Sequence, residues 1–541
     1  MDSSALSGRP QGSAQAPTSF QRGLWRWIAA VFAVFVLAGC GSLPAAPQRA
    51  DSRALAPSAD SALVKIAAAS TPSPELSGFR LLPLGVYSLD TRLQLIQRAT
   101  RSLDVQYYVL DNDSTGQLLL ARLDEAARRG VRVRLLVDDL YTTHTDELLH
   151  AFAATPNVEV RVFNPFCCAR SAGFAGRFAA SLLDVRRLNH RMHNKLLVAD
   201  GVMAVAGGRN IADDYFLRGS QHNFVDLDAL MVGPVAGELA SIFDQYWNNP
   251  VVWPIDAVTP ADAPPVELSA RFERGVSDAR AAPPLELPST DALGYGPISE
   301  DLDAGKLGLI WGQAMAVADP PDKLSRDADK AYADSLAYKA LMKIWSAEHD
   351  VTITSPYLIP GPMGIEAFKA LGERKVKVTV LTNSLAATDE PLVHTGYTRY
   401  RDRLLDAGVD LYELSPSRTQ RNKRLGMFGS SSGRLHAKTA VVDGTKSFIG
   451  SMNLDPRSRT QNTELGVVVD SPQLAKEMLR VVKISKLQSA YRVRRSGDGL
   501  SLEWLAFDDD NEVVLHEEPE STWWLRVHNF FFGLFVPEQL L

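Results

Sequence analysis

Hydrophobic and polar positions along the chain predict two similar α/β segments. In the first, residues 103–108 (LDVQYY) have the composition of a strand. A helix pattern follows, with apolar side chains on one face at Leu118, Leu119, Leu123 and Ala126. Gly130 ends this helix, and residues 131–137 (VRVRLLV) alternate as a second strand does.

The second segment repeats this order. Residues 351–357 (VTITSPY) predict a strand, residues around 365–371 a helix, and residues 376–381 (VKVTVL) another strand. The equivalent strands begin 245 residues apart, at Val131 and Val376. A repeat of strand, helix and strand predicts an α/β fold. At 541 residues the chain is too long for one core, so we expect two domains.

One motif occurs once in each repeat. The first copy is residues 193–200 (HNKLLVAD), followed after six residues by GGRN at 207–210. The second copy is residues 436–443 (HAKTAVVD), followed after six residues by GSMN at 450–453. The two histidines are 243 residues apart, so the motif moves with the repeat. One copy would be a weak signal, but two copies with the same Gly-x-x-Asn spacing are a strong one.

Each copy predicts a β-hairpin. The Asp-Gly pairs at 200–201 and 443–444 separate strand-like runs, and Asp-Gly is favoured in two-residue hairpin turns. Asp200 and Asp443 complete the motif at the turn, where we favour a structural role over a catalytic one. Alternate residues of a strand share a face. This places the catalytic candidates in pairs, His193 with Lys195 and His436 with Lys438.

The motif side chains supply what phosphodiester cleavage requires without a metal or cofactor. That reaction needs a nucleophile, an acid for the leaving group, and cations or donors at the phosphoryl oxygens. Asn210, Asn453 and Ser451 are the candidates for binding phosphate, beside the two lysines. A histidine nucleophile also needs an acceptor at its other ring nitrogen. Asp226 and Glu464, which follow the two histidines by 33 and 28 residues, are the candidates for that role.

The paired motif resembles that of the phospholipase D superfamily and, within it, the bacterial cardiolipin synthases, especially the type C branch. Shorter matches lie at residues 191–195 (RMHNK), 208–211 (GRNI), 226–228 (DLD), 382–389 (TNSLAATD) and 450–455 (GSMNLD). The likeness extends over about residues 75–541. Gly208 departs from the pattern, because many members carry Ser there, and so the first copy lacks one hydroxyl donor.

The resemblance implies two α/β sandwich domains with central mixed sheets, related by a pseudo-twofold axis, with both motifs in one active site. It also implies a covalent phosphatidyl-histidine, for which we assign His193 as nucleophile and His436 as acid and then base. The expected activity is a phosphatidyl transfer that makes cardiolipin from phosphatidylglycerol-type donors. Two alternatives stay open: hydrolysis of a phospholipid or, less favoured, of a nucleic acid, and a non-catalytic membrane scaffold.

Charge narrows these alternatives. The formal net charge is −6 and no basic tract occurs, which argues against a nucleic-acid partner. Two complete motifs argue against a scaffold. We therefore expect phospholipid substrates and a membrane surface as partners.

The N-terminus predicts export. Arg22 and Arg26 precede an apolar run at 27–38 that is short for a bilayer span. The run ends in LAGC, which resembles the lipobox of bacterial lipoproteins and implies lipidation of Cys40 after removal of residues 1–39. An uncleaved anchor is the alternative. The expected location is a bacterial membrane, lipid-anchored and facing the periplasm, with a net charge of −8 after cleavage, because the signal carries three arginines and one aspartate.

Composition predicts a flexible tether at 40–75 and a linker at 255–300. These bound a first domain at 76–254 and a second domain at 301–484, both phospholipase D-like by the resemblance, with a C-terminal extension at 485–541. The tether and the linker are rich in Ala and Pro. Residues 523–536 (WWLRVHNFFFGLFV) form the most aromatic stretch of the chain. It is too short to span a bilayer, and we favour an interfacial membrane segment over a core helix.

Overall fold

The computed structural model describes residues 47, 49–166, 173–180, 184–259, 262–323, 335–422, 424, 431–499, 501–508 and 511–533. Residues 46–165 and 186–541 form one compact unit, which holds both repeats. Residues 1–45 and 166–185 form a second unit, which contains α6 (Gly173–Ala180). Cys40 and the expected signal peptide lie outside the described residues.

The first repeat forms a mixed sheet in the order β1-β8-β6-β5-β2-β3-β4-β9, in which β2, β3 and β4 are parallel and the other neighbours antiparallel. Its strands are β1 (Ser77–Leu82), β2 (Ser102–Tyr107), β3 (Arg132–Asp138), β4 (Val158–Phe163), β5 (Lys195–Ala199), β6 (Met203–Gly207), β8 (Asp228–Val232) and β9 (Val252–Pro254).

The second repeat forms a mixed sheet in the same order, β10-β17-β16-β15-β11-β12-β13-β18, which β19 and β20 extend. Its strands are β10 (Ile310–Ala318), β11 (Asp350–Thr354), β12 (Lys377–Asn383), β13 (Asp410–Leu414), β15 (Thr439–Val442), β16 (Lys446–Gly450), β17 (Leu465–Asp470), β18 (Ala490–Arg495), β19 (Leu502–Asp508) and β20 (Asn511–Leu515). The internal repeat predicted from the sequence is therefore confirmed.

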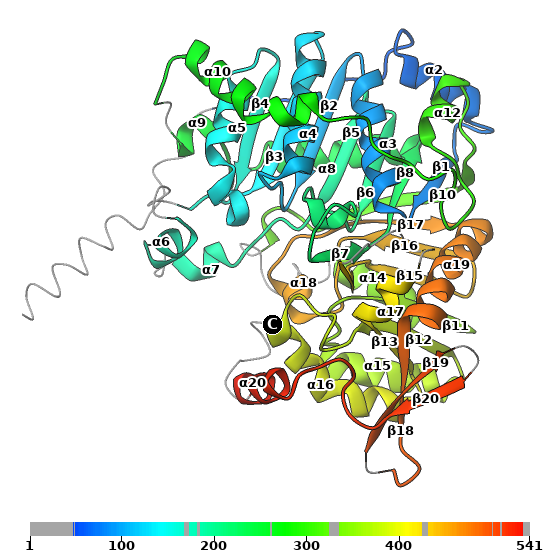
Figure 1. Cartoon of the computed structure of the whole chain (residues 1–541). Helices are drawn as coiled ribbons and strands as arrows, with labels where there is room; N and C mark the ends of the chain where they lie inside the picture. Colours follow the sequence, from blue (N-terminus) through cyan, green and yellow to red (C-terminus); the bar gives the residue numbers. More distant parts are fainter. Residues whose placement is uncertain are drawn as a thin grey trace, which may run out of the picture. The chain divides into compact units, whose positions relative to one another are not determined.

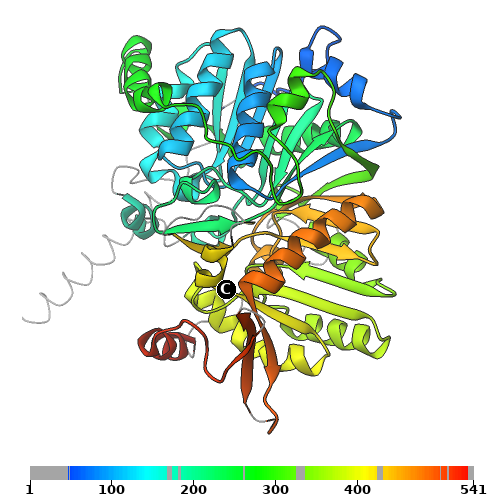
Figure 2. The ribbon, with the colours of Figure 1, turned by 45° about the vertical axis from the view of Figure 1, so that its right-hand side comes forward.

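Pairings between strands join the repeats. β1 and β10 pair antiparallel and connect the two sheets at their edges. A separate two-stranded parallel sheet pairs β7 (His222–Val225) of the first repeat with β14 (Ser432–Leu435) of the second. Figures 1 and 2 show the first repeat, coloured blue to green, above the second, coloured yellow-green to red.

Helices cover both sheets. On the first repeat and the segment after it lie α2 (Ala62–Ser70), α3 (Gly85–Arg98), α4 (Ser114–Arg128), η1 (Asp139–His144), α5 (Asp146–Ala153), α7 (Val185–Leu188), η4 (Asp213–Tyr215), α8 (Pro234–Trp247), α9 (Ile255–Val258), α10 (Pro265–Gly275), α11 (Ser277–Ala281) and α12 (Ile298–Asp303). The second repeat carries α14 (Leu336–Trp345), α15 (Gly361–Glu373), α16 (Pro391–Asp406), α17 (Pro416–Arg421), α18 (Pro456–Thr460), α19 (Pro472–Ser489) and α20 (Trp523–Gly533). No helix in the described part of the chain is both long and apolar enough to cross a bilayer.

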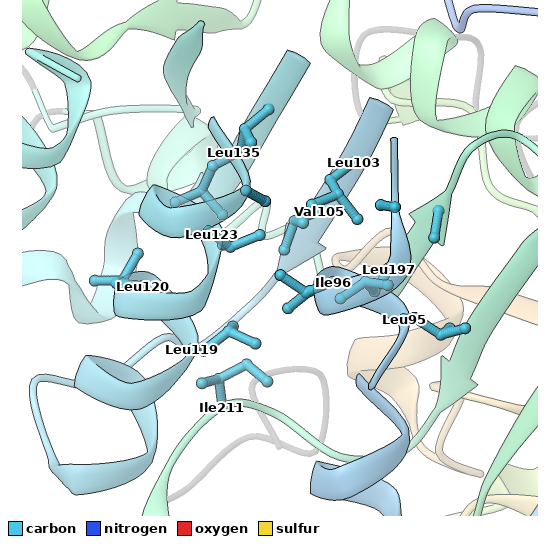
Figure 3. Packing of buried hydrophobic residues seen from close by; sticks show 14 of the residues in the cluster. Leu95, Ile96, Leu103, Val105, Leu119, Leu120, Leu123, Leu135, Leu197 and Ile211 are labelled. Atoms are coloured by element: carbon cyan, nitrogen blue, oxygen red, sulfur yellow. The ribbon is translucent and has the colours of Figure 1, made fainter. Parts of the chain in front are cut away.

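The apolar faces predicted from the sequence form the cores. Leu119 and Leu123 of α4 pack against Leu103 of β2 and Leu135 of β3, together with Ile96 of α3 (Figure 3). Alternate residues of the same strands reach the opposite face of the sheet, where α8 packs. There α8 and α19 belong to one continuous apolar cluster, so the two repeats share part of their core.

Part of the expected flexible tether is ordered. Residues 62–70 form α2, and Leu63 and Ile66 on its inner face are buried in the first core. The Ser61 hydroxyl donates to the Asp200 carboxylate at 2.5 Å, which anchors the start of this helix. The prediction missed this helix because three large apolar residues within a short Ala-rich segment are a weak helix signal. The expected linker at 255–300 likewise contains helices, of which α10 buries Phe272 in the first core.

Candidate active site

The two motif copies form the predicted hairpins. β5 and β6 pair antiparallel around Asp200-Gly201, and β15 and β16 pair antiparallel around Asp443-Gly444. All four turn residues have positive φ, from 49° to 69°. That backbone conformation explains the Asp-Gly sequence, because Asp tolerates and Gly favours it.

The carboxylates of the motif aspartates accept hydrogen bonds from backbone N–H groups and do not orient the histidines. The Asp200 carboxylate accepts hydrogen bonds from the backbone N–H of Arg101 at 2.8 Å and of Ser102 at 3.0 Å. The Asp443 carboxylate accepts from His349 N at 2.8 Å and Asp350 N at 3.1 Å. Each aspartate thus ties its hairpin turn to the start of the neighbouring strand, which is a structural role.

The first histidine is held by a carboxylate of the second repeat. His193 Nδ1 lies 2.9 Å from Glu464 Oε2, and both side chains are buried. The Ser458 hydroxyl donates to the other Glu464 oxygen at 2.7 Å, and the Ser451 hydroxyl donates to Oε2. Because the ionised carboxylate accepts, His193 carries its proton on Nδ1 and leaves Nε2 free to react.

The second histidine is held by a carboxylate of the first repeat. His436 Nδ1 lies 2.7 Å from Asp226 Oδ2, and the other Asp226 oxygen accepts from Leu227 N at 2.7 Å. The sequence identified both carboxylates as candidates. It could not show that each one serves the histidine of the other repeat.

Backbone contacts explain this exchange. The backbone N–H of His193 donates to Thr463 O at 2.8 Å, and that of His436 donates to Val225 O at 2.8 Å. Each histidine is therefore bound to the residue just before the carboxylate that orients its ring. The β7–β14 pair places the second of these segments in register.

Electrostatics keep both histidines neutral. Burial lowers the pKa of His193 to about 3, although Glu464 opposes this, and burial lowers the pKa of His436 as well. Burial raises the pKa of the Asp226 carboxyl, but His436, Lys438 and Arg209 together outweigh burial and lower this pKa to about 2, so Asp226 is ionised. Two neutral imidazoles with ionised carboxylates behind them leave one nucleophile and one proton acceptor ready.

The two motif lysines interact with the same two carboxylates, Asp226 and Glu464. The ammonium groups of Lys195 and Lys438 donate to the backbone carbonyls of His193 and His436 respectively, at 2.6 Å in the first case. Burial lowers the pKa of Lys438 to about 8 and holds that of Lys195 well below its usual range. The charge of Lys438 lowers the pKa of Lys195, and the charge of Asp226 raises that of Lys438, so both repeats contribute to one field.

The predicted phosphate-binding residues have different environments. Asn210 donates from Nδ2 to the Tyr215 hydroxyl at 2.9 Å. Asn453 Oδ1 is buried without a hydrogen-bond partner among the described residues, and as an amide oxygen it can accept from a donor on a ligand, such as a hydroxyl. Ser451 is occupied, since its hydroxyl donates to Glu464 and accepts from Leu465 N at 3.0 Å.

Gly208 is explained by the carboxylate beside it. A Cβ atom at this position would lie 2.1 Å from Asp226 Oδ1. The first repeat therefore combines Gly208 with the shorter Asp226, whereas the second combines Ser451 with the longer Glu464. The absence of a side chain at Gly208 leaves room for the carboxylate that orients His436.

Two tyrosines belong to the site that the motif did not identify. The Tyr108 ring lies edge-on to His193 at 5.0 Å between centroids, and Lys195 Nζ lies 5.2 Å from the centre of the same ring. Tyr215 makes the equivalent edge-on contact with His436 at 5.1 Å. Tyr108 is the last residue of the predicted strand at 103–108, and this position was a usable signal, because functional residues gather where strands end.

Asp455 is a further acidic group at the site. It caps α18 by accepting from Ser458 N at 2.7 Å, and burial raises its pKa to about 7. Its charge raises the pKa of Lys438, which places it near that ammonium group. Among the described residues no cluster of three or more His, Cys, Asp or Glu side chains could hold a metal ion.

Comparison with known proteins agrees with this geometry. The family model "Cardiolipin synthase, PLD-like domain" matches residues 93–247 and 341–483, once in each repeat. The chain belongs to this family. Cardiolipin synthase C of Escherichia coli (strain K12) is 38% identical over 444 residues, which cover 81% of this chain and 90% of that protein. An uncharacterized protein of Helicobacter pylori (strain J99) is 32% identical over 464 residues, which cover 84% and 88%.

A solved structure supports the fold. Phosphatidylserine synthase of Haemophilus influenzae Rd KW20 superposes with a TM-score of 0.53, covering 87% of this chain and 96% of that one at 12% identity. This confirms the α/β architecture with two phospholipase D-like domains. As a family member the chain is an enzyme of the cardiolipin synthase-like phosphatidyltransferase and phosphodiesterase type.

Proposed function

We propose that this enzyme transfers a phosphatidyl group from a phosphatidylglycerol-type donor to a lipid alcohol and so makes cardiolipin. The observation that carries the chemistry is the pair of histidines, each oriented by a carboxylate of the opposite repeat. The choice of lipid is supported by the 38% identity to the protein named cardiolipin synthase C.

In the first step, Nε2 of His193 attacks phosphorus and the bond to the leaving glycerol oxygen breaks. His436, protonated in the substrate complex, gives its Nε2 proton to that oxygen. The anionic phosphodiester favours this protonation, and Asp226 stabilises the resulting imidazolium. Lys195, Lys438 and the Asn453 amide stabilise the negative charge on the phosphoryl oxygens.

In the second step, the acceptor hydroxyl attacks phosphorus and His436 takes its proton. The bond from phosphorus to His193 breaks, which restores the free enzyme. When the donor and acceptor are both phosphatidylglycerol, the products are cardiolipin and glycerol.

The assignment of His193 as nucleophile has support from its surroundings. Its pKa of about 3 keeps the ring unprotonated at neutral pH, as a nucleophile requires. Glu464 behind it is fixed by two serine hydroxyls and so holds the ring in one orientation.

Transfer rather than hydrolysis requires the acceptor to outcompete water. Water is present at about 55 M, and effective molarities of well-oriented groups reach about 10⁵ M or more. Both histidines are buried, at 7% and 5% exposure, which limits the access of water.

We also propose a membrane location, with Cys40 lipidated on the periplasmic side of a bacterial membrane. Trp523 and Trp524 of α20 are 67% and 68% exposed, and Phe531 is exposed on the same face of the helix. On the other side α20 packs on α16, where Thr395 donates to Asn529 Oδ1 at 3.2 Å. An exposed aromatic face on an anchored helix fits the interfacial layer of a bilayer.

The test supplies phosphatidylglycerol, alone or with phosphatidylethanolamine, to the purified full chain in the presence of a chelator. Products are followed over time by mass spectrometry. We expect cardiolipin and glycerol to appear together. Phosphatidic acid as the dominant product throughout, without cardiolipin, would establish the alternative, a phospholipase D.

A further inference from the structure

A hollow adjoins the active site in the second repeat. It has a volume of about 110 Å³ and lies between α14, α15 and the segment that follows the second motif. Its lining residues are Leu341, Trp345, Ile359, Pro360, Met363, Gly364, Met452, Asn453, Leu454, Asp455 and Arg459.

The residues that line the hollow form an apolar group and a polar group. The side chains from α14 and α15 and the turn before α15 are apolar, as are Met452 and Leu454. The polar members all come from residues 453–459. Two of these connect the hollow to the catalytic groups: Asn453 belongs to the Gly-x-x-Asn of the motif, and Asp455 interacts electrostatically with Lys438.

An apolar stripe on α14 continues the hollow to the surface. Tyr338, Leu341, Met342 and Trp345 recur at the spacing of one helix face. Met342 is half-exposed, and Met363 across the hollow on α15 is 64% exposed. Large apolar side chains at such exposure beside a polar reaction centre mark a place for an apolar ligand.

We propose that this hollow binds the ester end of one fatty-acyl chain of the phosphatidyl group that is transferred, and that the α14 stripe guides the rest of the chain toward the bilayer. The proposal rests on the proposed function, which places a phospholipid phosphate at Asn453 and the lysines. A phosphatidyl group carries its acyl chains only a few bonds from phosphorus, so an apolar wall that begins at Asn453 meets a chain directly.

The size of the hollow limits what it can hold. A water molecule has about 30 Å³ in the liquid and a methylene group is of similar size, so about 110 Å³ holds the first few methylene groups. Burial of each methylene strengthens binding about fourfold. The rate should therefore depend steeply on acyl length for short chains and weakly beyond them.

The test measures kcat/KM of the full chain for phosphatidylglycerols with butanoyl to decanoyl chains, at one fixed detergent concentration. Met363→Glu places a charge on the wall of the hollow. Met315→Glu makes the same change at an exposed methionine of β10, outside the hollow, and is the matched control. Thermal unfolding confirms that both variants fold.

We expect the octanoyl to butanoyl ratio of kcat/KM to fall at least tenfold in Met363→Glu and to stay at the wild-type value in Met315→Glu. Partition of the lipids into detergent is the same for every variant at one detergent concentration, so it cancels when the ratios of the variants are compared. A wild-type ratio in Met363→Glu would overturn the acyl-chain site.

A chainless substrate separates this outcome from failure of the proposed function. The wild-type protein should cleave bis(p-nitrophenyl) phosphate, which has no acyl chain. If it does so but shows no preference for acyl length among the phosphatidylglycerols, the acyl-chain site is overturned and the phosphodiester chemistry stays intact. No cleavage of any phosphodiester would overturn both. As a second measurement, a photoreactive diazirine near the ester of one chain should label residues 341–345 or 359–364. Labelling confined to other segments would contradict the proposal.

Discussion

At the scale of single residues, the two half-sites reach the same geometry with different side chains. Asp226 is one methylene shorter than Glu464, and Gly208 stands where the second half has Ser451. The short carboxylate uses the space that Gly208 leaves and binds Leu227 N, whereas the long one is fixed by serine hydroxyls. The difference concerns how each carboxylate is supported, while the contact to histidine is the same.

Gly208→Ala should therefore impair catalysis without unfolding the protein. The new Cβ would displace the Asp226 carboxylate and so release the His436 ring. We expect kcat to fall at least tenfold. Gly237→Ala in α8, where a Cβ meets no atom within 4 Å, is the control and should be neutral or stabilising. Full activity of Gly208→Ala would show that Asp226 does not position His436.

The pH profile should report Lys438. Its pKa of about 8 means that the ammonium is present below this pH and is lost as the pH rises, which removes a cation from the phosphoryl oxygens. We expect kcat/KM to decline above about pH 8, and the decline in Lys438→Arg to move to much higher pH, because Arg stays charged. Asp455→Asn removes the nearby carboxyl whose pKa is about 7, and so separates its effect on the pH profile from that of Lys438. A decline that remains in place in Lys438→Arg would assign it to another group.

At the scale of elements, the hairpin turns explain why the motif includes an aspartate far from the chemistry. The sequence predicted the hairpins from Asp-Gly, since the positive φ of these turns is a local property. It also located β2, β3, β11 and β12 to within a few residues, because their apolar patterns are regular. It could not predict α2, whose stability comes from contacts of Leu63 and Ile66 with distant residues.

Asp200→Asn should lower stability rather than turnover. Asn tolerates the positive φ but loses the charge that accepts from Arg101 N, Ser102 N and the Ser61 hydroxyl. We expect a loss of about 1–3 kcal/mol in the free energy of unfolding, with kcat per folded molecule within about twofold of wild type. Asp443→Asn, at a more exposed turn, should lose less. A drop of 100-fold or more in kcat with unchanged stability would return Asp200 to a catalytic role.

The α20 helix should contribute to membrane binding. Trp523→Ser with Trp524→Ser removes exposed aromatic area without touching the Thr395–Asn529 contact. We expect binding of the chain without residues 1–40 to anionic vesicles to weaken at least tenfold in co-sedimentation. Phe507→Ser, at another exposed aromatic residue, should bind as the parent chain does. Equal binding of all three would assign α20 to a different role.

At the scale of the whole molecule, the active site exists only when the two repeats are together. Each histidine belongs to the motif of its own repeat. The carboxylate that orients its ring and the carbonyl that accepts from its backbone N–H come from the other repeat. The repeats also share apolar core at α8 and α19. A pattern within one repeat cannot show such contacts, because they depend on how β7 and β14 pair across more than 200 residues. Candidate residues were thus predictable, but their partners were not.

The most direct test of this account is to trap the covalent intermediate. His436→Ala is mixed with a p-nitrophenyl phosphatidyl ester, whose leaving group departs without an acid, and the protein is analysed by mass spectrometry. We predict one phosphatidyl group per chain, bound to His193, since no base remains to activate an acceptor. Adding Glu464→Ala should abolish this adduct, because the ring then loses its acceptor in the second repeat. Turnover of the ester without an adduct on His193, or an adduct that forms equally well without Glu464, would contradict an active site shared between the two repeats.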